Sequence, residues 1–158
     1  MKQKYFLKLA FFILLSLVST FNLKAQLNTG EKIPTFSIND QFEKAQVIPS
    51  TTKTIIVAGS KDASDVIKEY LLGLEGDSLT KNNAVYIADI SGMPSLITKF
   101  FALPKMKKYP FKIFLLDETN NDKFLMQENK ITIYEVEDQL IKDVKYIATK
   151  EELATYIK

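Results

Sequence analysis

Ser60, Lys61 and Ser64 are the side chains of this 158-residue chain that are best placed to contact an anion or another small ligand. They follow a short β-branched run and begin a stretch with helical periodicity, so we expect them at a helix N-terminus. Free backbone amides and the helix dipole attract negative charge there. Asp62 and Asp65 oppose that attraction, and in the simpler interpretation Ser60 or Asp62 only caps the helix while Lys61 is solvated.

A Ser–Lys catalytic dyad is a weaker interpretation of the same segment. Ser60 and Lys61 are adjacent, and neighbouring side chains do not normally point at each other. A nucleophilic pair of this kind also needs a buried lysine with a lowered pKa, and nothing in the local sequence indicates such burial. We therefore name no catalytic residue.

Asp117, Thr119, Asn121 and Glu128 match four oxygen-ligand positions of a calcium-binding loop. The sharp turn of such a loop requires glycine at its sixth position, where this chain has Asp122. The segment also follows an expected strand, whereas a calcium loop follows a helix. We interpret it as an ordinary solvated turn and expect no metal site.

Lys105, Lys107, Lys108 and Lys112 form a second candidate site, a basic patch that Lys99 extends. Such a patch steers an acidic partner or an anionic surface toward the protein, with a modest effect after salt screening. The simpler interpretation is a solvated face that maintains solubility. The neighbouring aromatic side chains have a spacing that favours burial, so we expect them in the core and not in a ligand site: Phe100, Phe101, Tyr109 and Phe111.

The residue types that are missing exclude more chemistry than the candidates support. The chain contains no Cys, His or Trp, and all 21 basic residues are lysines. Without Cys there is no disulfide, thiol nucleophile or thiolate metal site, and without His there is no imidazole base or ordinary zinc or haem ligand set. Serine triads are excluded as well. We expect no cofactor, and any catalysis would depend on Asp, Glu, Lys, Ser or Tyr.

The first 25 residues have the composition of a secretory signal peptide. Lys2, Lys4 and Lys8 precede an apolar run over residues 9–21, and a small residue, Ala25, precedes Gln26 at the expected cleavage site. The run is too short for a membrane-spanning anchor, and a lipoprotein signal would need Cys. We therefore expect an exported protein, periplasmic or extracellular, without a membrane span after cleavage.

Cleavage after residue 25 changes the net charge of the chain. The full sequence has a formal charge of +2, and loss of four N-terminal lysines leaves 17 lysines and 19 acidic residues, a charge of −2. A nucleic-acid-binding protein would show a broad basic surface. We expect no nucleic-acid partner.

The remaining chain predicts one α/β domain over residues 35–158, after a polar lead-in at 26–34. Apolar runs predict strands at 54–58, 84–90, 111–116, 131–136 and 140–147, with an edge strand at 35–40 and a hairpin formed by the last pair. Helical periodicity follows the strand at 54–58 and continues to Gly73, a second helix begins near Pro94, and Thr149 with Glu152 forms a capping box for the last. Right-handed crossovers then predict a three-layer α/β/α sandwich with helices flanking a mixed sheet.

Short motifs carry a resemblance to a known superfamily. Residues 30–40 read Gly-Glu-Lys-Ile-Pro-Thr-Phe-Ser-Ile-Asn-Asp, a Gly and Pro lead followed by Phe and a strand that ends in Asp. With the order of elements, this opening resembles the thioredoxin-like superfamily, and within it the peroxiredoxin-like branch. Lys-Lys-Tyr-Pro-Phe at 107–111, with Phe-Leu-Leu-Asp at 114–117, is similar to the cysteine-free YtfJ-type exported bacterial proteins.

The resemblance implies a mixed five-stranded sheet and a redox centre where the first main strand meets its helix, at residues 58–65. This chain reads Ala-Gly-Ser-Lys-Asp-Ala-Ser-Asp there and lacks both thiols. Glu128, Asn129 and Lys130 stand where thioredoxins place a cis-proline, in front of the strand that begins at Ile131. Thiol–disulfide exchange requires a thiolate, so neither the redox activity nor any catalytic residue transfers to this chain.

Two functional hypotheses follow. The first is a non-redox binding or adaptor module of the cell envelope that contacts an unknown protein partner through its sheet edge or the former redox face. The second is an enzyme, or a carrier of a cofactor or ligand, that uses Asp, Glu, Lys or Ser groups near Ser60, Lys61 and Ser64. The sequence does not predict an oligomeric state.

Overall fold

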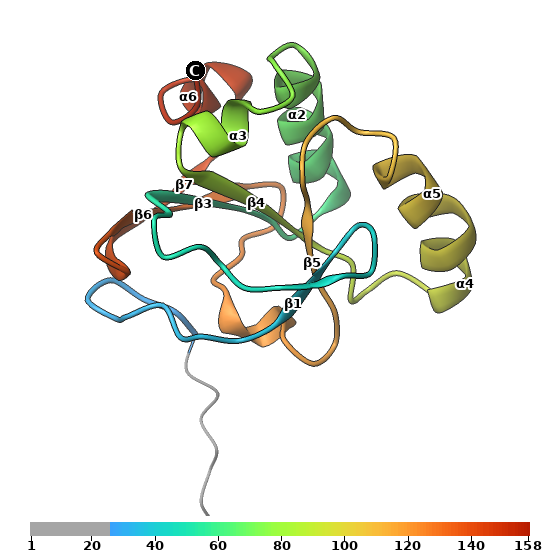
Figure 1. Ribbon diagram of the computed structural model, residues 1–158, viewed down its shortest axis with the longest axis horizontal. Coiled ribbons are helices and arrows are strands. Elements are labelled where there is room, and N and C mark those ends of the chain that lie inside the picture. The colour runs from blue at the N-terminus through green and yellow to red at the C-terminus, as the bar shows by residue number, and fades with distance from the viewer. Residues whose placement is uncertain (1–25) are drawn as a thin grey trace, which may run out of the picture.

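The computed structural model describes residues 26–158, so the predicted signal segment at 1–25 lies outside the described residues. The fold is built on a mixed sheet of seven strands in the order β2-β1-β5-β4-β3-β6-β7 (Figure 1). The strands are β1 (Ile38–Asp40), β2 (Ala45–Gln46), β3 (Thr54–Ala58), β4 (Ala84–Asp89), β5 (Phe114–Leu116), β6 (Ile131–Glu137) and β7 (Leu140–Ile147). The predicted α/β class, with a mixed sheet and flanking helices, is confirmed.

The sheet has seven strands and not the five that the resemblance implied, because the short hairpin of β1, which the sequence predicted at 35–40, and β2, which it did not predict, extends the sheet beyond β5. The Asp40 carboxylate closes that hairpin by accepting hydrogen bonds from the backbone amides of Phe42 and Lys44. The predicted strand at 35–40 was therefore wrongly placed at the edge, since β2 lies outside it. Strand β5 begins later than predicted, because the buried Gln41 side chain bonds the backbone of Phe111 and Ile113 in place of a neighbouring strand.

Helices occupy the connections between the strands. Their bounds are α2 (Lys61–Leu72), α3 (Ser78–Lys81), α4 (Ser95–Ile97), the π-helical turn η1 (Thr98–Ala102), α5 (Leu103–Met106), the 3-10 helix η2 (Asn121–Lys123) and α6 (Lys150–Leu153). Elements α4, η1 and α5 follow one another without a break and together form the helical segment 95–106. Between residues 26 and 158, no helix has both the length and the hydropathy that a membrane crossing requires.

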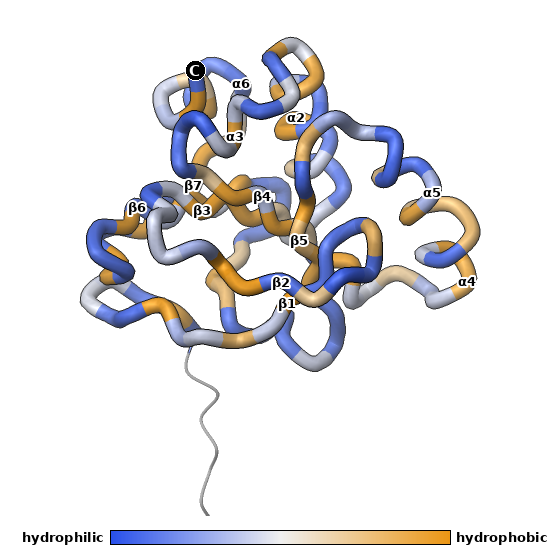
Figure 2. The backbone as a smooth tube through the Cα atoms, viewed as in Figure 1, coloured by the Kyte–Doolittle hydropathy of each residue, from blue (hydrophilic) through white to orange (hydrophobic). Residues whose placement is uncertain are grey.

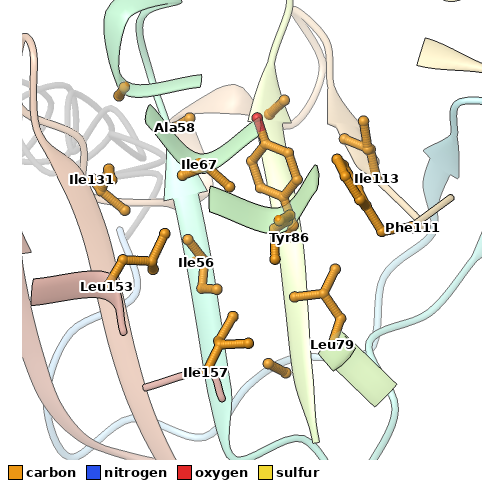
Figure 3. Packing of buried hydrophobic residues seen from close by; sticks show 14 of the residues in the cluster. Ile56, Ala58, Ile67, Leu79, Tyr86, Phe111, Ile113, Ile131, Leu153 and Ile157 are labelled. Carbon is orange, nitrogen blue, oxygen red and sulfur yellow. The ribbon is translucent and has the colours of Figure 1, made fainter. Parts of the chain in front are cut away.

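The two parallel crossovers place their helices on the same face of the sheet. Strands β3, β4 and β5 are parallel neighbours, so the chain steps twice in the same direction, first through α2 and then through segment 95–106. Right-handed crossovers in one direction cover one face only. Ile67 of α2, Leu103 of α5 and Leu153 of α6 accordingly share one hydrophobic cluster with Ile56 and other sheet residues, part of which Figure 3 shows.

The opposite face is covered mainly by irregular chain and the short helix η2. Strand alternation sends Ile55 and Val57 to this side, where they pack with Leu27, Ile33 and Phe124. The lead-in segment reaches this core because its backbone bonds along the β6–β7 hairpin; the Ile33 amide, for example, donates to the Gln139 carbonyl over 2.8 Å. One face of the sheet is therefore covered by helices, α2 among them, and the other face is covered by a thin layer of mostly irregular chain.

The predicted helix caps are confirmed. Ser60 caps α2, its hydroxyl accepting a hydrogen bond from the Ala63 amide at 3.3 Å, and Gly73 is the C-cap residue. Thr149 and Glu152 form both hydrogen bonds of a capping box at α6. These caps depend on residues within one helical turn of each other, which is why local sequence predicts them.

The prediction that four aromatic residues are buried is correct for Phe111, partly correct for Tyr109, and wrong for Phe100 and Phe101. Phe111 is buried, and Tyr109 stacks on it with ring centroids 5.4 Å apart while remaining partly exposed. Phe100 and Phe101 are 62% and 68% exposed. Segment 95–106 packs on the core through Leu103 and Met106, and this leaves its aromatic face turned away from the sheet.

Candidate functional site

A cleft of about 650 Å³ lies between the N-terminal half of α2 and the segment that joins β4 to β5; we call it the α2–α5 cleft. Its volume is in the range of small-molecule and peptide sites. Loop 89–94, strand β4 and Ile113, which precedes β5, contribute to it as well. It is lined by Gly59, Ser60, Lys61, Ser64, Asp65, Lys68, Tyr86, Ala88, Asp89, Ile90, Ser91, Gly92, Met93, Pro94, Ala102, Lys105, Met106, Tyr109 and Ile113.

The walls of the α2–α5 cleft are largely apolar, and its charged groups come from helix α2 and from Lys105 and Asp89. Ala88 supplies a small side chain from the sheet, while Met93 and Met106 supply adaptable thioether side chains from the opposite side. The Asp89 carboxylate accepts a hydrogen bond from the Ser91 amide at 2.8 Å, which holds the loop that leaves β4. The arrangement is suited to an apolar ligand or side chain with a polar end.

The junction between β3 and α2, where the resemblance places a redox centre, contains Gly59 and Ser60 in this protein. Gly59 is in close contact with Met126: a Cβ atom added to Gly59 would lie 2.8 Å from the Met126 sulfur and 2.9 Å from its Cβ. The Ser60 hydroxyl is engaged in capping α2. The junction is thus occupied by packing and capping interactions.

Asp65 carries the strongest charge interactions in the cleft. Its carboxylate accepts hydrogen bonds from the ammonium groups of Lys61, at 2.7 Å, and of Lys68. These two lysines lower the pKa of Asp65 to about 2, the hydrogen bond from Lys61 being the largest cause. The same contact raises the pKa of Lys61. Asp65 and Lys61 therefore keep their charges through the physiological pH range, and the single carboxylate is shared by two ammonium groups.

Tyr86 is the buried polar side chain that reaches the cleft from the sheet. Burial raises the pKa of its phenol to about 12, and a hydrogen bond with Ser64 opposes that rise. The phenol stays protonated at neutral pH because loss of its proton would leave a charge in an apolar environment. It supplies a neutral hydrogen-bonding group at the base of the cleft.

The structure brings together the predicted Ser60, Lys61 and Ser64, and it adds Lys105 from the predicted basic patch. The other members of that patch lie apart from the cleft. Lys107 forms an ion pair with Glu43 at 3.1 Å, Lys108 is exposed, and Lys112 lines a separate cleft of about 180 Å³.

Sequence reasoning did not identify the side chains of the opposite wall, among them Met93, Ala102 and Met106. No spacing signal could have found them, because they are ordinary small and apolar residues. They line a cleft only because segment 95–106, with the loop that precedes it, stands beside α2 on the same face of the sheet.

The turn at 117–120 is held by its own side chains. The Asp117 carboxylate accepts hydrogen bonds from the Thr119 amide at 2.9 Å and from its hydroxyl at 2.6 Å, while Asn120 accepts one from the Asp117 amide. Across residues 26–158 no group of three or more His, Cys, Asp or Glu is arranged to hold a metal ion. The peptide bonds of the same range are all trans, and the loop before β6 turns at Asn129 with φ of +57°.

Comparison with solved structures identifies the architecture. The chain is similar to the thioredoxin domain of a thiol-disulfide oxidoreductase from Bacteroides vulgatus, with a TM-score of 0.55, 14% identity, and coverage of 84% of this chain and 100% of that one. It is also similar to a peroxiredoxin-like protein from Aquifex aeolicus, with a TM-score of 0.52, 9% identity, and coverage of 83% and 86%. For a peroxidoxin from Mycobacterium tuberculosis the TM-score is 0.51, with 12% identity and coverage of 83% and 94%.

These similarities show that the fold is thioredoxin-like, and at such identities they show the fold alone. The predicted resemblance to the thioredoxin-like superfamily is confirmed at this level, and its peroxiredoxin-like branch is represented among the similar structures. The narrower similarity to YtfJ-type proteins stays a prediction. No protein-family model matches the sequence, and no curated protein sequence matches it either.

Proposed function

We propose that this cysteine-free chain with a thioredoxin-like fold is an exported binding module, and that the α2–α5 cleft is its contact surface. The observation that carries the proposal is an open, apolar-walled cleft beside the β3–α2 junction, where the resemblance to the thioredoxin-like superfamily places a redox centre and this chain has no Cys. Without a thiol the scaffold cannot exchange disulfides. What remains at that position is a recognition surface with fixed charges.

The electrostatics of the cleft support binding over general acid–base catalysis. A general acid or base works best with a pKa near the operating pH. The pKa of Asp65 is lowered to about 2 and that of Tyr86 is raised to about 12, so both values move away from neutrality. The pKa of Lys61 is raised as well. These groups hold constant charges, which suits the orientation of a partner and not the transfer of protons.

The lining of the cleft indicates the chemistry of the partner. Its walls accept an apolar segment, and Lys105 has no acidic partner among the ion pairs of residues 26–158. Lys61 and Lys68 both already pair with the Asp65 carboxylate. We therefore expect an extended, mostly apolar segment of an envelope protein, with an acidic group that approaches Lys105.

Affinity capture with two pairs of variants tests this proposal. Gly92→Trp adds bulk at the cleft, where a new Cβ meets no atom within 4 Å, and Leu72→Trp adds the same side chain at the exposed far end of α2. Lys105→Gln removes a charge from the cleft. Its control, Lys108→Gln, removes a charge from an exposed residue three positions later in the chain, outside the lining of the cleft.

The two cleft variants should lose a partner, captured from an envelope extract, that both controls retain, while circular dichroism shows all four proteins folded. Capture of the same partners by all four variants would refute the cleft as the contact surface. The export component is tested separately by fractionation and by mass spectrometry of the exported protein, which should begin at Gln26. An intact N-terminus in the cytoplasmic fraction would contradict export.

A second candidate function is the carriage of a small ligand, favoured by the volume of the cleft alone. About 650 Å³ is enough for a drug-sized molecule. Native mass spectrometry of the purified protein should then show an added mass that the Gly92→Trp variant lacks. An unmodified mass together with a featureless visible spectrum would count against this function.

A further inference from the structure

We propose that segment 95–106 docks the protein on an anionic lipid surface. Four large apolar side chains of this segment are exposed: Leu96 at 67%, Ile97 at 45%, Phe100 at 62% and Phe101 at 68%. We call them the α4–α5 apolar face. They are four of the seven large hydrophobic side chains that are exposed in residues 26–158, and they lie within six consecutive positions.

The π-helical turn η1 explains why these side chains share one outward face. Exposure along this segment repeats every four residues. The exposed pairs are 96–97, 100–101 and 104–105, and the partly buried positions are 98, 102 and 106. A regular α-helix repeats every 3.6 residues and would rotate such a pattern around its axis. The i to i+5 hydrogen bonding of a π turn takes up the extra residue and keeps the apolar pairs aligned.

Lysines lie close to this face in the sequence, and acids are absent from the whole segment that contains it. From Ile90 to Leu116 the sequence has five lysines and no Asp or Glu, although residues 26–158 as a whole have 17 lysines and 19 acids. Of the five, Lys107 is paired with Glu43. Lys99, Lys105 and Lys108 are exposed and do not enter any ion pair of residues 26–158.

A helix that presents Phe and Leu beside Lys has the composition of segments that lie in the membrane interface. The apolar side chains enter the boundary between headgroups and acyl chains, and the lysines contact lipid phosphates. The anionic surface thus complements both properties of the face, its exposed apolar area and its positive charge.

A second copy of the chain fits this face less well. Contact between two such faces would bring unpaired lysines together, and like charges in contact oppose association. A peptide partner would need a groove, whereas the helical segment that carries these four side chains lies at the outer edge of the molecule (Figure 1). The four side chains are exposed and are not part of the lining of the α2–α5 cleft. In Figure 2 this outer segment carries hydrophobic colour at that edge. A bilayer is a surface that accepts such a projecting helix.

Because the chain contains no Trp, a Phe100→Trp variant provides a fluorescent probe located in this face alone, even in the full chain. Its emission should shift to the blue when vesicles containing phosphatidylglycerol are added, and brominated lipid should quench it. Vesicles of phosphatidylcholine alone should give a much smaller response, and added salt should reduce the response to the anionic vesicles. The matched control Leu72→Trp, exposed on α2, should not respond.

Replacement of Lys99, Lys105 and Lys108 with Gln in the Phe100→Trp background should weaken vesicle binding by about 100-fold, since each lysine near such a surface contributes about fivefold. An unshifted emission with anionic vesicles overturns the proposal. So does a shift that depends on protein concentration without lipid, which would indicate a second copy. A response to polyglutamate but not to vesicles would indicate an acidic protein partner and would likewise overturn it.

Discussion

Replacement of Asp65 with Asn tests the charge arrangement on which the cleft depends. The carboxylate is held between Lys61 and Lys68 on α2, and its pKa of about 2 compares with 3.8 for a free Asp. Taken at face value, such a difference corresponds to about 2.4 kcal/mol of stability. Asp65 is 38% exposed, however, and solvent screens a pair at such a position.

The two ion pairs are spaced at i,i+4 and i,i+3, and exposed helix pairs contribute about 0.3–0.5 kcal/mol each. We therefore expect Asp65→Asn to lower the free energy of unfolding by about 1 kcal/mol at pH 7. This corresponds to a decrease of about 4 °C in the melting temperature for a chain of this size. Urea denaturation followed by circular dichroism at low ionic strength measures the effect.

The pH dependence of the difference distinguishes charge from packing. The folded-state pKa of Asp65 lies below the unfolded value, so its contribution is complete above about pH 4 and is lost as the pH falls to about 2. The stabilities of wild type and Asp65→Asn should converge in acid and also in high salt. A difference that stays constant from neutral pH to pH 2 would refute the electrostatic explanation.

Three further substitutions test other contacts, each by urea denaturation at neutral pH. Thr149→Ala removes the capping interactions of α6 and should cost about 1 kcal/mol, and an unchanged midpoint would show that the cap is dispensable. Gly76→Ala places a Cβ 3.0 Å from both the side chain and the carbonyl oxygen of Pro110, so we expect a loss of about 1–3 kcal/mol; a stabilised variant would mean that the neighbouring backbone yields freely. Tyr134→Phe leaves the Leu125 amide without the hydroxyl that it donates to at 2.6 Å, for an expected loss of about 1–2 kcal/mol, which a neutral result would contradict.

Predictions from local pattern were accurate where the determining interactions lie close together in the chain. The β-branched run at 54–58 is strand β3, buried along its whole length, because a continuous apolar run has to be covered on both faces. Ser60 and Thr149 cap helices whose free amides lie three residues away. The turn between β6 and β7 at Asp138 and Gln139 has positive φ at both positions, as a tight hairpin requires.

The same reasoning failed where a distant part of the chain decides the outcome. Phe100 and Phe101 have a spacing that favours burial, but whether a helix face is buried depends on the surface that it meets, and here Leu103 makes the contact with the core. The additional strand β2 was missed because two residues carry too little pattern to indicate a strand. Its partner, β1, consequently lies inside the sheet and not at its edge.

The sequence by itself determined which chemistry is closed to this protein, since no fold can supply the missing thiols and imidazoles, and it determined the main strands and the caps of α2 and α6. Tertiary structure alone decided that Ser60, Lys61 and Ser64 line the same cleft as Lys105, and that four apolar side chains face outward. The physical reason is the range of the interactions. Hydrogen bonds within a helical turn are specified by neighbouring residues, whereas a cleft and a free helix face result from two crossovers that cover the same side of one sheet.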